Sequence, residues 1–179
     1  MEAIDERDAI LWDVQRSIRY HDRRRAFFDF WHRLTAAFSL IFASAAAATL
    51  MNATGHDIAI GAAFVVAVLS AVDLVVGTAE KARRHDDLRR RFIKLESDIQ
   101  RNELPSSERL VTWREERLAI EMDELPIYRA LDALCWNELA IATRRASPRH
   151  IPFIQRLTAH WIRWENIAGK LLPPDDGDG

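Results

Sequence analysis

Residues 34–79 read LTAAFSLIFASAAAATLMNATG, then HD, then IAIGAAFVVAVLSAVDLVVGTA, and form the most apolar part of the chain. The first segment, residues 34–55, has no formal charge over about 22 positions, and the second, residues 58–79, carries one charge, Asp73. A helix of about 20 apolar residues crosses the hydrocarbon core of a bilayer. The short polar connection at His56 and Asp57 forces the two segments to run antiparallel. We predict an all-α membrane protein with a two-helix transmembrane hairpin, its spans at about 34–54 and 58–79.

The alternative is a buried helical hairpin inside a soluble protein. It needs a shell of other helices around both segments, but the remainder of the 179-residue chain is short and rich in charge. A surface helix of a soluble protein also shows a polar stripe. Residues 34–53 contain only scattered small polar side chains, and hydroxyls are tolerated in lipid because they bond their own backbone. The membrane interpretation is therefore preferred.

Basic residues gather on both sides of the apolar stretch and are absent from its connection. Those before it are Arg16, Arg19, Arg23, Arg24, Arg25 and Arg33; those after it are Lys81, Arg83, Arg84, Arg89, Arg90, Arg91 and Lys94. By the positive-inside rule both termini are cytoplasmic and the connection faces outward. The clusters Arg23–Arg25 and Arg89–Arg91 are expected to contact anionic lipid headgroups. The net charge of −2 does not indicate a nucleic-acid partner.

A helical pattern of apolar residues continues beyond both ends of the stretch. Before it, Leu11 and Ile18 belong to one such stripe, and after it Leu88, Phe92, Leu95 and Ile99 form another. With the turn centred near Gly55, facing residues have numbers that sum to about 110, so Ile18 faces Phe92 and Leu11 faces Ile99. The sequence therefore predicts long cytoplasmic helical extensions of the hairpin, held by interdigitating apolar side chains.

Prolines divide the rest of the chain into additional C-terminal helices. Pro105 ends the extension, Ser106 or Ser107 caps a helix over residues 108–124, and Pro126 marks a restart near the first turn of the next helix. Residues 147–172 are predicted to form a C-terminal amphipathic helix that either lies on the membrane surface or packs on the other helices. The acidic tail, residues 173–179, is expected to be disordered.

Asp73 is the candidate gating residue, because an ionisable group at membrane depth indicates function. The register places it one turn from Arg33, so a structural Asp73–Arg33 pair and a pore-lining role both remain open. Small residues that let helix backbones approach closely in lipid recur along both spans: Ala36, Ser39, Ala43 and Ala47 on the first, and Ala63, Ala67 and Ala71 on the second. They pack either within one hairpin or between protomers. Two helices cannot enclose a water path, so a pore requires a homo-oligomer.

The sequence contains no enzyme motif. It lacks a glycine-rich phosphate loop, the His-Glu-x-x-His zinc motif and the Gly-x-Ser-x-Gly elbow, so we expect a non-enzymatic protein with no cofactor or bound metal. The register brings His21 and Asp22 towards His85 and Asp86, but such surface pairs are usually solvated or ion-paired. Cys135, the single cysteine, excludes an intrachain disulfide and is expected to be a packed thiol.

Three stretches resemble the SLATT families, the SMODS- and SLOG-associating two-transmembrane effector domains. They are RSIRYHDRR at residues 16–24, RHDDLRRRF at 84–92 and CWNE at 135–138. The likeness covers residues 10–143, and we assign residues 1–146 to a domain of this kind. The resemblance implies a bacterial conflict effector in the inner membrane that forms pores when a nucleotide-linked sensor fires. No fused sensor is recognisable, so a separate sensor protein or ligand is expected to trigger it.

Two other functions remain open. The chain is alternatively a non-catalytic membrane anchor or scaffold that recruits a cytoplasmic partner through its C-terminal helices. A soluble helical protein is the third interpretation.

Overall fold

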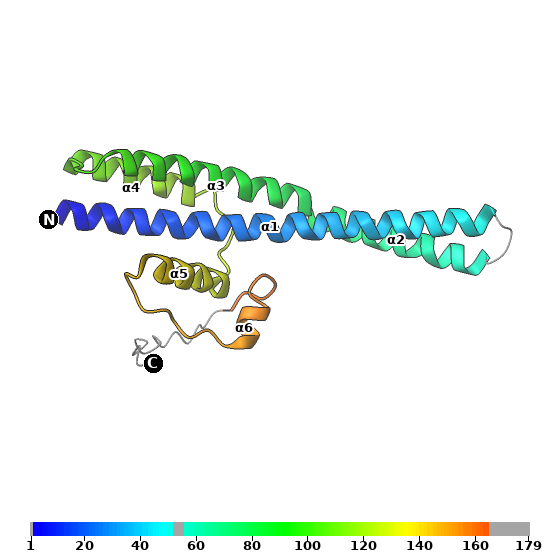
Figure 1. Ribbon diagram of the computed structural model, residues 1–179. Helices are drawn as coiled ribbons and strands as arrows, with labels where there is room; N and C mark the ends of the chain where they lie inside the picture. Colours follow the sequence, from blue (N-terminus) through cyan, green and yellow to red (C-terminus); the bar gives the residue numbers. More distant parts are fainter. Residues whose placement is uncertain (1, 52–55, 165–179) are drawn as a thin grey trace. The chain divides into compact units, whose positions relative to one another are not determined.

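The computed structural model describes residues 2–51 and 56–164, and its regular structure is helical with no strand in those ranges (Figure 1). The helices are α1 (Glu2–Met51), α2 (His56–Val76), α3 (Thr78–Arg101), α4 (Ser107–Glu121), α5 (Arg129–Thr143) and α6 (Phe153–Leu157). The predicted all-α class is confirmed. The chain divides into two compact units, which we call the polar unit (Met1–Arg24 with His85–Gly179) and the apolar unit (Arg25–Arg84).

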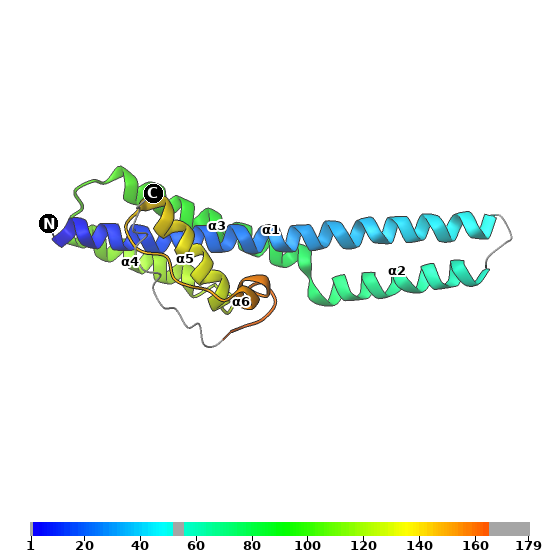
Figure 2. The same cartoon turned by 60° about the horizontal axis from the view of Figure 1, so that its bottom comes forward.

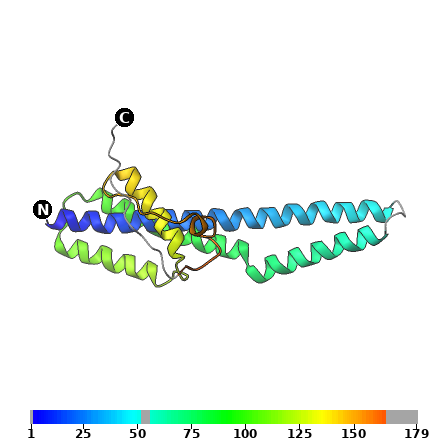
Figure 3. The same ribbon diagram turned by 90° about the horizontal axis from the view of Figure 1, so that it is seen from below.

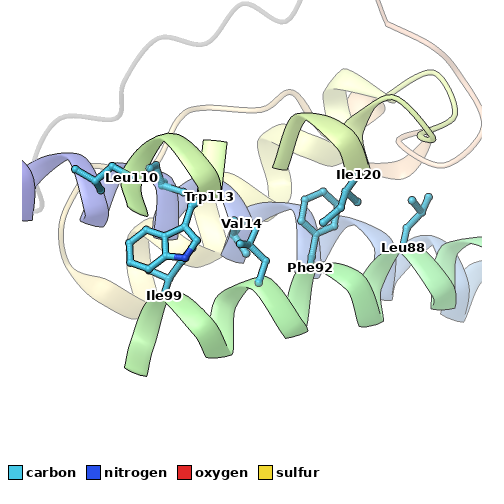
Figure 4. Close-up of a cluster of buried hydrophobic side chains, with 9 residues drawn as sticks. Val14, Leu88, Phe92, Ile99, Leu110, Trp113 and Ile120 are labelled. Carbon is cyan, nitrogen blue, oxygen red and sulfur yellow. The ribbon is translucent and has the colours of Figure 1, made fainter. Parts of the chain in front are cut away.

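The core of the polar unit lies between the first part of α1, α3 and α4 (Figures 2 and 4). Its buried members are Ile10, Val14, Leu88, Phe92, Leu95, Ile99, Leu110, Trp113 and Ile120, with Leu11 and Ile18 packed against them. Gln15 Nε2 donates a 2.8 Å hydrogen bond to Glu96 Oε1, and Arg7 Nε donates one of 2.9 Å to the Asn102 carbonyl. Both pairs have residue numbers that sum to within one of 110, so the predicted register is confirmed in this unit.

The helices after Pro105 differ from the prediction at their ends. Of the two predicted caps, Ser106 rather than Ser107 caps α4, because its hydroxyl accepts a 3.2 Å hydrogen bond from the Arg109 amide. The helix ends at Glu121 rather than at 124, and Pro126 lies in a loop rather than in the first turn of α5. Tyr20 Oη holds this loop by accepting a 3.0 Å hydrogen bond from the Tyr128 amide.

The predicted amphipathic helix over residues 147–172 is wrong in its described part. Only Phe153–Leu157 is α-helical, and turns follow it; residues 165–179, including the predicted disordered tail, lie outside the described residues. Two side-chain hydrogen bonds hold the turns after α6. The Arg24 guanidinium donates to the His160 carbonyl at 2.9 Å, and Trp164 Nε1 donates to Thr158 Oγ1 at 3.0 Å.

The apolar unit contains the second part of α1 and the antiparallel helix α2 (Figure 3). Ala59 and Ala62 of α2 are buried, whereas most of its large apolar side chains are exposed. Gly77 separates α2 from α3 and has a φ of +62°, a left-handed conformation that favours glycine. A Cβ at Gly77 would approach nothing closer than 4.0 Å, so backbone conformation rather than lack of space favours glycine there.

Among the described residues, one helical segment is long and apolar enough to cross a membrane by its length and composition. This segment is α2 together with α3, Asp57–Arg101, and only 11% of its most apolar window is buried. The first predicted span, residues 34–54, extends past Met51, where the described part of α1 ends. The structure therefore supports one candidate span and does not confirm the two-span hairpin.

Candidate functional site

Asp73 lies near the end of α2, where side chains from three helices of the apolar unit meet. Its Oδ2 is 3.2 Å from His32 Nδ1 on α1, and its Oδ1 accepts a hydrogen bond from the Thr78 hydroxyl at the start of α3. The side chain of Asp73 is largely covered, whereas that of His32 is about half exposed. The carboxylate therefore links α1, α2 and α3 just before the helix break at Gly77.

The predicted partner of Asp73, Arg33, is replaced by its neighbour His32. Successive residues of an α-helix point about 100° apart, so a shift of one residue turns a different side chain towards α2. Arg33 is exposed, and the Asp73–Arg33 pairing is wrong. The change matters chemically, because histidine gains or loses its charge within the physiological pH range and arginine does not. The contact is an ion pair only when His32 is protonated.

The small residues singled out from the sequence face outward. Ala36, Ala43, Ala47, Ala63, Ala67 and Ala71 are exposed and Ser39 is half-buried, whereas Ala59 and Ala62 are the buried alanines of α2. None of the predicted small residues is buried within the hairpin; Ala59 and Ala62 of α2 are buried there instead. The predicted lines remain available to another protomer.

Many of the arginines predicted to contact lipid headgroups bind other protein groups. Arg24 is 5% exposed, lies 4.3 Å over the Tyr128 ring, and has its pKa lowered chiefly by burial. For Arg24 the prediction is therefore wrong. The remaining five have carboxylate neighbours: Arg23 contacts Glu138, Arg25 contacts Asp29, Arg89 and Arg90 contact Asp86, and Arg91 contacts Asp123. Arg90 is the most exposed of the six and the best placed to reach lipid.

A buried chain of titratable side chains lies in the polar unit. His21 Nδ1 is 2.9 Å from His85 Nδ1, and His21 Nε2 is 2.9 Å from Glu124 Oε1. Both imidazoles are buried, and the Phe92 ring stacks on His21 with centroids 5.6 Å apart. The register correctly predicted that His21 and His85 meet. Glu124 has no sequence signal that links it to them.

Asp22 and Asp86 do not join this chain. The Asp22 carboxylate lies 3.7 Å from the Arg89 guanidinium. The Asp86 carboxylate lies 3.0 Å from Arg89 and also contacts Arg90. Burial, the largest single influence, would raise the pKa of Asp86. The contacts with Arg89 and Arg90 together outweigh it, so the pKa of Asp86 is lowered. No group of three histidine, cysteine or acidic side chains in the described ranges is arranged to hold a metal ion.

The contacts of the His21–His85–Glu124 chain constrain which ring nitrogens carry hydrogen. When His21 Nε2–H donates to the Glu124 carboxylate, the two Nδ1 atoms share one hydrogen, so one of them donates and the other accepts.

A cavity of about 400 Å³ lies next to the His21–His85–Glu124 chain, and Glu124 is part of its lining. It is lined by Arg16, Ser17, Tyr20, Glu121, Glu124, Leu125, Pro126, Ile127 and Asp132. Burial raises the pKa of Glu121 and of Asp132, while Arg16, 3.3 Å from Asp132, opposes the shift in the latter. Three carboxyl groups and one guanidinium line the cavity, a charge balance unfavourable to a phosphorylated ligand.

Comparison of the chain with protein-family models, curated proteins and solved structures gives no match.

Proposed function

We propose that this chain is a membrane effector that oligomerises and permeabilises the bacterial inner membrane, with both termini in the cytoplasm. The observation that carries the proposal is the exposure of the apolar side chains of α2. Leu74 and Val75 are 84% and 86% exposed, and Ile58, Ile60 and Phe64 are exposed as well. Burying such side chains in an apolar medium stabilises each by about 1.5–3 kcal/mol, so this surface favours lipid over water.

The second part of α1 supports the two-span arrangement. Phe38, Leu40 and Ile41 are exposed in the same manner as the residues of α2. Its hydroxyls bond within the helix: Ser44 Oγ donates to the Leu40 carbonyl at 2.8 Å, and Thr49 Oγ1 donates to the Ala45 carbonyl at 3.0 Å. Such back-bonding satisfies polar groups in hydrocarbon.

The outward alanines support the oligomer that a pore requires. Apolar side chains gain little from one another in lipid, so protomers associate where small residues let backbones approach closely. Ala43→Leu and Ala67→Leu are therefore expected to weaken assembly in detergent and in nanodiscs. Ala45→Leu is the matched control, because Ala45 is also exposed but lies on a different face of α1.

Asp73 tests the pore directly. On induced expression, the wild-type protein should depolarise cells that carry a membrane-potential dye, whereas Asp73→Leu should insert and lose depolarisation. Asp57→Asn is the matched control, because Asp57 is an exposed carboxylate at the other end of α2. Full depolarisation by Asp73→Leu would exclude Asp73 from the permeation step, and recovery of the protein without detergent in a high-speed supernatant would exclude the membrane assignment.

The alternative function is a passive membrane anchor or scaffold. It is favoured by the separate clusters of buried side chains in the polar unit, which allow that unit to present a folded surface to a cytoplasmic partner or sensor protein. A scaffold should tolerate Asp73→Leu and show no depolarisation under any trigger. A monodisperse monomer in nanodiscs, together with no depolarisation, would select the scaffold.

A further inference from the structure

The segment around α6 exposes a cluster of large apolar side chains, which we call the C-terminal apolar surface. Its members, Phe153, Ile154, Leu157, Trp161 and Ile162, are each between 45% and 74% exposed. Single exposed apolar residues are normal on proteins, but a contiguous patch indicates an interaction site. Five such residues lie within ten positions of the chain, in α6 and directly after it.

A segment adapted only to water turns its large apolar side chains towards the interior, whereas this segment exposes five of them. The side chains that face the interior are Ile151, Gln155 and Ala159, and two of these three are polar or small. Trp164 also packs, partly buried, against the cluster that contains Ala159, whereas the five members of the C-terminal apolar surface point away from the interior. Removing apolar surface from water is favourable, so an inward-facing glutamine beside outward-facing tryptophan and phenylalanine indicates that the outer face is covered in the working protein.

The charge around this surface identifies what covers it. Residues 147–164 contain Arg149, Arg156 and Arg163 and no aspartate or glutamate. Arg156 and Arg163 are exposed beside the apolar side chains. Tryptophan, phenylalanine and leucine flanked by arginine are typical of segments that lie in the interfacial region of an anionic membrane.

A hydrogen bond attaches the segment that carries this surface to α1, at a residue close in sequence to the apolar stretch. The Arg24 guanidinium bonds the His160 carbonyl at 2.9 Å, and Arg24 precedes Leu34, the first residue of the apolar stretch, by ten residues of α1. The bond from Trp164 to Thr158 closes the turn that carries Trp161. We propose that the C-terminal apolar surface docks on an anionic lipid bilayer, with its aromatic and aliphatic side chains at headgroup depth and Arg156 and Arg163 on the lipid phosphates.

This docking is distinct from pore formation and does not require it. The test uses the full chain with Ile154→Cys in a Cys135→Ala background, labelled with a small environment-sensitive fluorophore. The protein is placed in vesicles of phosphatidylcholine alone or mixed with phosphatidylglycerol. The label should become blue-shifted and protected from aqueous iodide only with phosphatidylglycerol, and salt should reverse the protection.

Two controls separate lipid docking from general burial. Val111→Cys carries the same label at an exposed apolar site on α4 and should stay accessible to iodide in both vesicles. Arg156→Glu combined with Arg163→Glu changes two exposed side chains and should reduce the protected fraction by about tenfold or more. Equal accessibility of the labels at 154 and 111 in phosphatidylglycerol vesicles would overturn the proposal.

Protection that is independent of lipid charge, salt and the two arginines would also overturn it. If dilution of the protein in lipid then restores access, a second copy of the chain covers the surface; if deletion of residues 165–179 restores access, the chain's own C-terminal segment does. Sedimentation of the unlabelled protein without added vesicles tests the membrane spans separately, so failure of docking and failure of the proposed function are distinguishable.

Discussion

Replacing Phe92 by alanine tests the packing that joins α1, α3 and α4. Phe92 is 0% exposed, belongs to the larger buried cluster, and stacks on the His21 ring. Truncating a buried phenylalanine to alanine costs about 3–5 kcal/mol, against a typical domain stability of about 5–15 kcal/mol. For a domain of this size each kcal/mol lowers Tm by roughly 4 °C, so we expect Phe92→Ala to lower it by roughly 12–20 °C.

Ile93 provides the matched control, because it is the next residue of α3 and is 38% exposed. Ile93→Ala removes a side chain of similar chemistry from the surface and should change the free energy of unfolding by no more than about 0.5 kcal/mol. The measurement is thermal unfolding of the purified full-length protein in detergent, followed by far-ultraviolet circular dichroism. Equal losses of Tm for the two variants would refute the packing and the register from which it follows.

Three further predictions concern single groups of the polar unit. Burial raises the pKa of the Cys135 thiol to about 12, so iodoacetamide at mildly alkaline pH should leave it unmodified until denaturant is added; rapid labelling of the native protein would contradict this. Cysteines at positions 15 and 96, in a Cys135→Ala background, should be joined within one chain by a short bismaleimide, because the native side chains bond at 2.8 Å; crosslinks formed only between chains would exclude this register. Burial, together with the charges of Arg24 and Arg23, lowers the pKa of His160 from 6.5 to about 4. The unfolded chain therefore binds a proton on His160 more tightly than the folded chain does, and the free energy of unfolding should fall as the pH drops from 6.5 towards 4. This loss of stability should be about 1–2 kcal/mol after allowance for the partial exposure of His160, and it should disappear in His160→Gln. If the difference in Tm between the wild-type protein and His160→Gln does not change across this pH range, the prediction is wrong.

The pattern of apolar residues determined the features that depend on local periodicity. It indicated helices throughout, a start of α4 at a cap formed by Ser106 or Ser107, and the facing of Leu11 and Ile18 with Ile99 and Phe92. These features are readable from sequence because a helix repeats every 3.6 residues and a short connection allows only an antiparallel return. His21 and His85 were brought together by the same register. Their contact at 2.9 Å is therefore a consequence of the hairpin geometry.

Tertiary structure decided the partners that depend on single-residue rotation or on distant segments. His32 rather than Arg33 meets Asp73, because a shift of one position turns a helix by about 100°. Glu124 reaches His21 from 103 residues away, and Arg24 reaches the His160 carbonyl from 136 residues away. Periodicity carries no information about such contacts. α6 ends early, at Leu157, and the exposed surface around it could not be read from the apolar spacing, which was consistent with one long amphipathic helix.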